Sequence, residues 1–522
     1  MGSPPAINRP PVSTLGTYLQ KVGLPSLFAP VDIATLVYFR IAFGGIMLWE
    51  VWRYFDKGWI SRYWIDPILN FPFFGFEWLH PWPGQGMYIH FIGLGILAIF
   101  IALGLWYRVS AILFFVGFSY IFLLEKARYL NHFYLICLIS FLLIFLPANR
   151  AFALDAWRRP GLRSQTVPAW TLWLLRIQIG IPYFYGGLAK INGDWLQGEP
   201  MRMWMADRTD FPLIGAFFTQ EWMVYFLSYG GLLLDVLVVP FLIWRRSRPY
   251  AFAAALLFHV MNVGLFNIGI FPWFMIAATA IFFDPSWPRW AMGKRLRDQP
   301  APTRLTPRHT LILALLGIYL FLQLVLPFRH YLYAGDPNWT EEGHRFAWHM
   351  KLRSKDADVN FIITNTVDNT VSSLDPNDIM PRWQVRKMAA RPDMILQLSH
   401  IIAEDIGGAD KDSIEVRAEA FASLNGREEQ QLIDPTVDLS KVRQSLLPAD
   451  WIVPLETPLS KNDEVNILHF DFFERLMPSA EPLSSTFQQP KEVIVHGNDS
   501  GVVGVTERSG QTLLRLTINY CL

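Results

Sequence analysis

The most constraining feature of this sequence is a series of nine apolar segments in its first two thirds. They cover residues 33–52, 86–106, 109–124, 132–146, 169–189, 222–244, 250–267, 269–284 and 309–327. A helix needs about 20 apolar residues to cross a bilayer, and several of these segments are somewhat shorter. Gly264, Gly269 and Pro272 interrupt the run over 250–284, which is too long for one crossing, so we count two spans there. The sequence therefore predicts an α-helical polytopic membrane bundle of about nine spans.

Charge supports a membrane protein and predicts its orientation. Charged residues make up 17% of the chain, against roughly 25% in soluble domains. With the N-terminus inside, the inner loops carry twice as many Lys and Arg residues as the short outer loops, as the positive-inside rule expects. We therefore expect a tail over 1–30, a transmembrane domain over 31–328 and an external domain over 329–522. If the source is a bacterium, such a multi-pass protein would lie in its inner or plasma membrane.

The external part is predicted to be a β-rich α+β domain. FAWHMKL (346–352) and DVNFIITNT (358–366) are rich in strand-forming residues. Residues 391–408 have apolar positions at helical spacing and end in a Gly pair, which predicts a helix and its stop. Asn425-Gly426 lies between two strand-like runs and predicts a hairpin. Two or three further strands are expected over 492–520.

Composition and motifs exclude several kinds of function. The net charge of +1 gives no support for a nucleic-acid partner. The two cysteines form no metal-ligand spacing, and no HExxH pattern is present, so no metal site is expected. Walker, dinucleotide-binding and nucleophile-elbow patterns are also absent from the sequence.

Three charged residues lie inside the predicted spans: Arg40, Arg176 and Asp235. Charges within a bilayer are costly and usually face the interior of a bundle. Counted from the inner helix ends, the three lie at similar depths. The sequence favours a structural polar clamp, with Asp235 paired to Arg40 or Arg176.

A second polar group converges on the outer half of the bundle. It consists of Asn131, His132, Tyr183, Tyr185, Lys190, His259, Asn262 and His330. Each also has a simpler interpretation. Lys190, at the end of a span, could extend into the headgroups, His132 could be an interfacial residue, and His259 could only bind a neighbouring helix.

The order and spacing of several motifs resemble one known family. In the membrane part these motifs are DIATLVYFRIAFG, LGLWYRVS, EKARYLNHFYL, YFYGGLAKINGDW, GGLLLD, FHVMNVGLFNIGIF and DPSWPR, and in the external part NWTEEGHRFAWHM and SLNGREEQQLIDPTVDL. Each is weak alone, but together they resemble the vitamin K-dependent γ-glutamyl carboxylases, in a short form of bacterial type.

The resemblance implies a coupled reaction. A reduced vitamin K, which is a menaquinol- or phylloquinol-type hydroquinone, is deprotonated, reacts with O2 and leaves as the 2,3-epoxide. The base formed on the way removes a γ-proton from glutamate, and the carbanion captures CO2. The family's lysine base falls on Lys190, its Asn-His pair on Asn131 and His132, and a histidine near the quinone on His330. The implied partners are the lipid bilayer, a glutamate-containing protein or peptide, and a quinone reductase that supplies the hydroquinone.

Basic residues that hold the glutamate carboxylate are reproduced only in part. The family position after the Lys190 loop falls on Ala206, with Arg208 nearby, while Arg353, Lys355 and Arg427 are further candidates. Epoxidation is therefore better supported than carboxylation. One alternative is a quinol epoxidase of the same fold without carboxylase activity. Another is a non-catalytic quinone-binding protein or a transporter.

Overall fold

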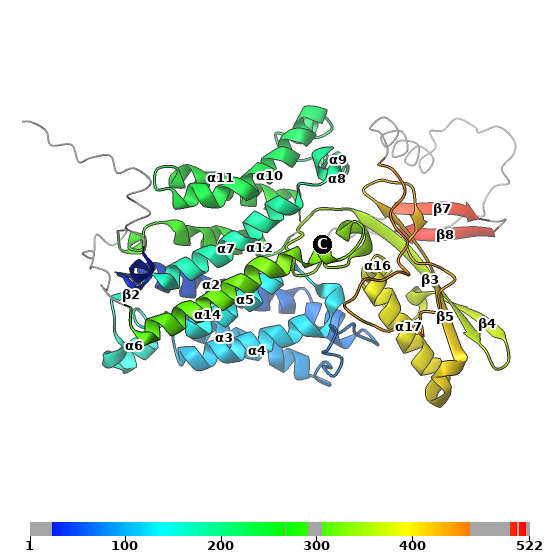
Figure 1. The fold of residues 1–522 in the computed structure, drawn as a ribbon, viewed down its shortest axis with the longest axis horizontal. Helices are drawn as coiled ribbons and strands as arrows, with labels where there is room; N and C mark the ends of the chain where they lie inside the picture. The colour runs from blue at the N-terminus through cyan, green and yellow to red at the C-terminus, as the bar shows by residue number, and fades with distance from the viewer. Residues whose placement is uncertain (1–22, 267, 291–304, 460–501, 509–510, 518–522) are drawn as a thin grey trace, which may run out of the picture.

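Each of the nine apolar segments contains a helix in the computed structural model, which describes residues 23–266, 268–290, 305–459, 502–508 and 511–517. The helices are α2 (Ala34–Asp56), α3 (Gly86–Leu103), α4 (Tyr107–Leu124), α5 (Asn131–Phe145), α7 (Trp170–Ala189), α10 (Glu221–Ile243), α11 (Arg248–Leu265), α12 (Phe271–Thr279) and α14 (Pro307–Val325). They run roughly along the long axis of the molecule, and the sheet-containing part lies at one end of them (Figure 1).

Five of these helices are long and apolar enough to cross a membrane. They are α2, α3, α4, α10 and the helix over Pro307–Leu332, which includes α14. Asn131–Phe145 and Phe271–Phe282 are apolar but shorter. The chain is thus a membrane protein with several spanning helices, while nine crossings and the orientation remain predictions.

The predicted break in the apolar run over 250–284 is confirmed. Helix α11 ends at Leu265 and α12 begins at Phe271, with Gly269 at φ +63° between them. A second glycine sets the distance between α7 and α10. A Cβ at Gly187 would lie 2.7 Å from a methyl of Val236 and 3.1 Å from the Cβ of Asp235. Only a residue without a side chain lets these helices approach so closely.

The part of the chain that follows α14 contains a four-stranded antiparallel sheet in the order β4-β3-β5-β6. Its strands are β3 (Lys355–Asn365), β4 (Thr370–Leu374), β5 (Ile414–Leu424) and β6 (Gln430–Gln431), and it packs against α16 (Arg382–Ala389) and α17 (Pro392–Gly407). The strand predicted over 358–366 and the helix predicted over 391–408 are confirmed. The hairpin is confirmed too, with Asn425 at φ +53° and Gly426 at φ +77°.

The strand predicted over 346–352 is wrong, and the strands predicted over 492–520 are described only in part. Residues 346–352 form no strand, because Phe346, Trp348 and Lys351 have positive φ and the chain turns there. The rings of Phe346 and Trp348 pack on Tyr134 of the bundle, with centroids 5.0 and 4.9 Å away, so their apolar character serves the core and not a sheet. Near the end, β7 (Val502–Arg508) pairs with β8 (Gln511–Thr517). Residues 492–501 lie outside the described residues.

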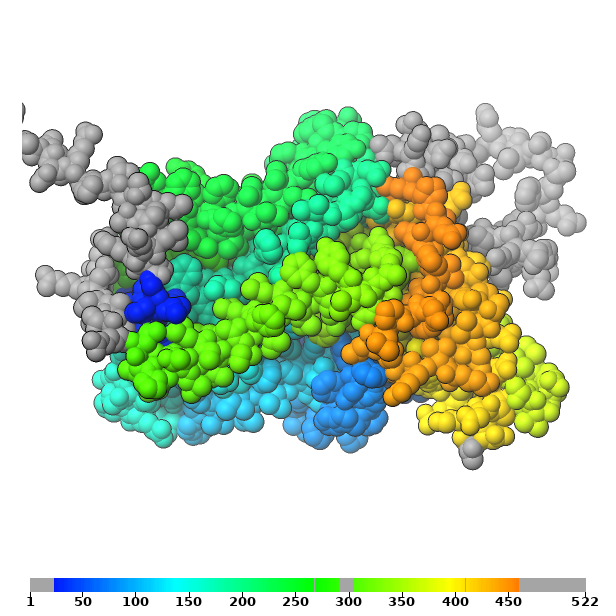
Figure 2. Space-filling model, viewed as in Figure 1, coloured from blue at the N-terminus to red at the C-terminus, as the bar shows by residue number. Residues whose placement is uncertain are grey.

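Buried polar contacts join the sheet domain to the helical bundle. Glu125, at the end of α4, accepts hydrogen bonds from Gln384 of α16 and from the backbone amides of Phe71 and Ala127. Beside it, Lys126 pairs with Asp393 of α17 at 2.8 Å. Figure 2 shows the resulting close contact between the two parts of the molecule. The lysine-containing end of α7 lies on this side of the bundle (Figure 1).

Candidate functional site

Lys190 lies directly after the last residue of α7 and is buried, with only 6% of its surface exposed. Its Nζ is 2.7 Å from Oδ2 of Asp235 on α10 and donates to the carbonyl of Gly186 at 3.1 Å. The indole of Trp195 lies 5.3 Å from the same nitrogen. A lysine that reaches for the headgroups would be exposed, so that simpler interpretation of Lys190 does not hold.

The predicted clamp between Asp235 and an intramembrane arginine is wrong. Arg40 donates to the carbonyl oxygens of Ala148 and Phe152. Arg176 donates to two other carbonyl oxygens, those of residues 281 and 283, both at 2.9 Å. The carboxylate of Asp235 is therefore the counter-ion of Lys190 and not of either arginine.

The error in the clamp has a structural cause. Depth was counted along the apolar segment of α10, but the first turns of this helix extend past the end of α7. There the indole of Trp195 donates to the carbonyl of Ser228 at 2.9 Å. Asp235, two turns further along α10, is thereby level with Lys190.

Asn131 is linked to the lysine through the turn at 346–350. Its Nδ2 donates to the carbonyl of His349 at 2.8 Å, and its Oδ1 accepts from the hydroxyl of Tyr129 at 3.0 Å. The same turn lies against Gly186, because a Cβ there would be 2.9 Å from Cε of Met350. Asn131 therefore fixes the segment that covers the helical turn holding Lys190.

His132 belongs to an aromatic cluster that is joined to α7 through Tyr183. Its ring stacks on Phe271 at 5.5 Å, and Phe271 meets the ring of His259 edge-on at 6.2 Å. His259 Nε2 is 2.6 Å from the hydroxyl of Tyr183. Tyr183 and Lys190 are seven residues apart on α7, or about 10 Å along a helix. The cluster and the ion pair thus lie along one stretch of α7.

Two imidazoles of this cluster keep free hydrogen-bonding atoms. Within the described residues, Nδ1 of His259 is buried without a partner, and His132 makes ring contacts but no hydrogen bond. Buried polar atoms normally have partners.

The other residues predicted to bind the quinone make neither a hydrogen bond nor a ring contact with the rings of His132, Phe271 or His259 in the part of the chain that the structure describes. Asn262 is half-buried one turn beyond His259 on α11. Tyr185 donates to the carbonyl of Leu324 on α14 at 2.6 Å, so its hydroxyl is engaged there. The ring of His330 lies 4.8 Å from that of His349, whose pKa burial lowers to about 3. His330 therefore adjoins the turn that Asn131 holds.

Most of the cations predicted to bind glutamate already have partners. Arg353 pairs with Glu341 and contacts His344. Lys355 donates to the carbonyl oxygens of residues 339 and 390, and burial lowers its pKa to about 7. Arg208 is half-buried, and no ion pair of its side chain is found in the described part of the chain. The nearby Arg202 pairs with Glu199 and with Glu221.

Arg427 links the hairpin of the sheet domain to the segment after Lys190. Its two terminal nitrogens are each 2.7 Å from an oxygen of Asp194, and Asn425 donates to the same carboxylate at 2.7 Å. Asp194 is a contact residue that the sequence did not single out, although it lies in the motif YFYGGLAKINGDW. Tyr183 was expected in the polar group, but nothing in the sequence signals that Tyr183 and Phe271 contact the histidines.

We expect Arg427 and Asp194 to stabilise the molecule as a pair. Arg427→Gln and Asp194→Asn should each lower the free energy of unfolding by about 2 kcal/mol, because each leaves a largely buried charge without its bidentate partner. The double variant should lose much less than the sum, which a double-mutant cycle in thermal unfolding measures. Additive losses would show that the two side chains act independently.

Comparison with known protein families matches the helical part and the sheet-containing part of the chain to one domain family each. Residues 28–287 match the HTTM domain, and residues 308–458 match the vitamin K-dependent gamma-carboxylase lumenal domain. The chain belongs to the vitamin K-dependent γ-carboxylase family. No solved structure was found to match the chain.

Membership of the carboxylase family assigns the candidate residues to its two domains. Lys190, Asp235 and the His132 cluster lie in the HTTM match, while Arg353, Lys355 and Arg427 lie in the lumenal match. Contacts such as Arg427 to Asp194 join the two. Among the residues that the structure describes, no group of three or more His, Cys, Asp or Glu side chains could hold a metal ion.

Proposed function

We propose that this carboxylase-family protein oxidises a vitamin K-type hydroquinone to its 2,3-epoxide and uses that reaction to γ-carboxylate glutamate in a protein. One observation supports this most strongly: a buried lysine at the end of a membrane helix has a single carboxylate as its counter-ion. Such a pair is costly to bury and is weak evidence for stability. A role in moving a proton accounts for its presence.

The aromatic cluster suits the hydroquinone. The rings of His132 and Phe271 offer a flat apolar surface, and the free nitrogens of His132 and His259 can meet hydroxyl groups. When bound, the hydroquinone supplies the electrons and, with O2, a base strong enough to remove a γ-proton from glutamate. The apolar surroundings keep water away from that base.

The residues of the chain supply proton transfer and positioning. Lys190 in its neutral form takes a proton from a hydroxyl group, and the resulting ammonium is stabilised by Asp235 at 2.7 Å. The carbonyl of Gly186 accepts a second hydrogen bond from the ammonium. Asn131 holds the turn at 346–350 over this site. The glutamate carboxylate would be bound from the external side, where Arg208 is the candidate cation whose side chain has neither a hydrogen bond nor an ion pair within the described residues.

A direct assay tests both halves of the proposal. Purified protein is given a reduced vitamin K, O2, labelled bicarbonate and a Glu-containing peptide, and epoxide and fixed label are followed together. We expect both products to form, each dependent on the hydroquinone. A folded protein that binds the quinone but forms neither product would exclude the enzymatic function.

Epoxidation without carboxylation is the second candidate function. It is favoured by the partners of the predicted glutamate-binding cations, since Arg353, Lys355 and Arg427 are all engaged within the protein. In the assay above, this alternative predicts epoxide without fixed label, at every peptide concentration. Label fixed in proportion to epoxide would exclude it.

A further inference from the structure

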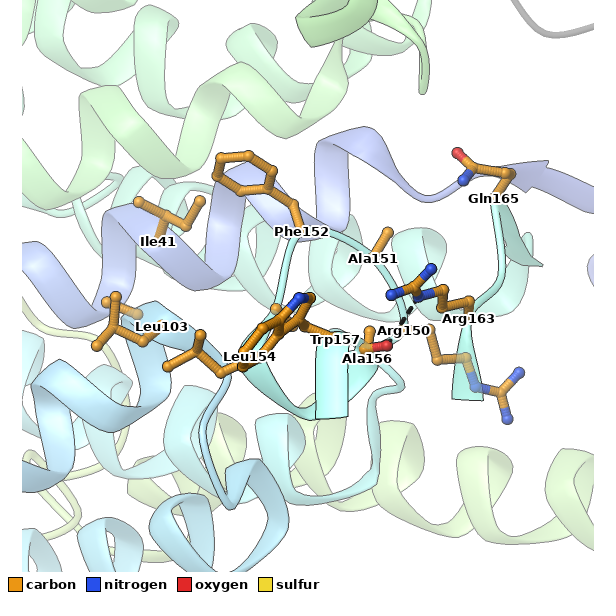
Figure 3. A pocket seen from close by; sticks show the side chains of 12 residues that line it. Ile41, Leu103, Arg150, Ala151, Phe152, Leu154, Ala156, Trp157, Arg163 and Gln165 are labelled. Atoms are coloured by element: carbon orange, nitrogen blue, oxygen red, sulfur yellow. Dashed lines mark hydrogen bonds between the residues drawn. The ribbon is translucent and has the colours of Figure 1, made fainter. Parts of the chain in front are cut away.

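A pocket of about 560 Å³ lies at the end of the bundle opposite the sheet domain (Figure 3). It is formed by α2, the last turn of α3 and the segment over 150–165, which includes the short helix α6 (Leu154–Arg158). In Figure 1, α6 lies at one end of the molecule and the sheet domain at the other. The pocket is therefore separate from the site around Lys190.

One wall of the pocket is apolar and continues along the spanning helices. Ile41 of α2 and Leu103 of α3 lie together on one side (Figure 3), and both are exposed, at 38% and 47%. Ile41 is seven residues into α2, or about 10 Å from the helix start. Both helices are long and apolar enough to cross a membrane, so this wall is placed to meet acyl chains.

The other wall of the pocket is basic. Arg150 is exposed, and its guanidinium has no hydrogen bond or ion pair within the described residues. Arg163 uses only Nε, which donates to the carbonyl of Ala156 at 2.9 Å, and its terminal nitrogens stay available. Figure 3 shows both guanidinium groups away from Ile41 and Leu103.

The nearby carboxylate does not neutralise these arginines. Asp155 lies on α6, but Oδ1 accepts from the backbone amide of Trp106, and Oδ2 accepts from the amide of Tyr107 and from Asn149. Within the described residues no salt bridge joins it to an arginine of this segment. The pocket thus combines an apolar wall with uncompensated positive charge.

We propose that this pocket binds an acidic phospholipid from the leaflet opposite the lumenal domain. The phosphate would accept hydrogen bonds from Arg150 and Arg163, and an acyl chain would lie along Ile41 and Leu103. Guanidinium groups suit phosphate because their N–H donors match its oxygens. Basic residues are common in loops next to spanning helices because they set the orientation of a membrane protein. Arg150 and Arg163, however, also line a cavity with an apolar side.

A matched pair of double variants tests the proposal. Full-length protein in detergent is mixed with equal amounts of phosphatidylglycerol and phosphatidylcholine, and bound lipid is counted by native mass spectrometry. We expect phosphatidylglycerol to be retained roughly 30-fold more than phosphatidylcholine, because each of the two basic residues contributes about 1 kcal/mol. Arg150→Gln/Arg163→Gln should remove this preference. The control, Arg158→Gln/Arg159→Gln, changes the charge equally in residues that do not line the pocket and should retain it.

Three outcomes would overturn the proposal. Equal losses in both double variants would show a diffuse attraction to the whole basic segment. Equal retention of the two lipids by the unaltered protein would exclude recognition of an acidic headgroup. Glycerol phosphate without acyl chains, if it displaced phosphatidylglycerol at millimolar concentration, would show an anion site and not a lipid site. Thermal unfolding of each variant verifies that the protein is folded.

Discussion

Lys190→Ala is expected to abolish both epoxide formation and fixation of labelled CO2. A positioned general base contributes about 10²- to 10⁴-fold to a rate, and in this proposal both products depend on the proton that Lys190 accepts. The effect should appear in turnover and not only in binding, because the aromatic cluster around His132 is unchanged. Parallel measurement of epoxide, label and quinone binding checks this result.

The alanine variant leaves Asp235 buried without its cation, which can itself cost 3–5 kcal/mol. Lys190→Ala/Asp235→Asn removes both charges and should recover most of the lost stability while remaining inactive. Lys57→Ala, which alters an exposed surface pair with Asp56, should leave both products unchanged. Epoxidation that survives in the stable double variant would remove Lys190 from its proposed role.

Asp393→Asn is expected to loosen the contact between the sheet domain and the bundle. Asp393 lies between Lys126 and Arg345, at 2.8 and 2.9 Å, and the side chains of these cations are only 3% and 11% exposed. The substitution leaves two buried cations facing an amide. Because the side chain of Asp393 is itself 39% exposed, we expect a loss of about 2 kcal/mol, below the value for a fully buried pair. Thermal unfolding and limited proteolysis at the domain junction measure it.

The pH dependence of this loss can be predicted. Burial alone would raise the pKa of the Asp393 carboxyl, but Arg345 and Lys126 hold it well below its usual range. The contribution of the Asp393 carboxylate to the free energy of unfolding is therefore fully present above the ordinary Asp pKa of about 3.9. It is lost only as the pH falls toward the lower pKa of Asp393 in the folded protein. The difference between wild type and variant should be constant from pH 5 to 8 and shrink below about pH 4. Asp405→Asn, on the exposed face of the same helix, should show no such difference.

Local signals in the sequence were sufficient for most elements. Helix positions followed from apolar runs, and the break before Phe271 followed from Gly269 and Pro272. The hairpin followed from Asn425-Gly426, because few other residue pairs adopt positive φ easily. The turn at 346–352 was missed because its aromatic residues resemble those of a strand, whereas their rings pack on a distant helix.

The sequence predicted which residues belong to the candidate site but not which of them contact one another. Residue type and order brought Lys190, Asn131 and His132 together as candidates, since a lysine at a helix end and polar residues in apolar runs are unusual. Which side chain faces Lys190 depends on how far α10 extends past α7, where the indole of Trp195 donates to the carbonyl of Ser228. Sequence spacing fixes position along one helix but carries no information about a neighbour's axial offset.

By itself, then, the sequence determined a helical membrane bundle, a sheet-containing second part and a family resemblance, because all three depend on local composition and order. Only the tertiary structure decided that Asp235 is the counter-ion of Lys190, that Asp194 holds the hairpin of the sheet domain, and that Arg150 and Arg163 share a pocket with apolar residues of two spanning helices. These are contacts between residues far apart in the chain, and the packing of separate helices, turns and loops sets them.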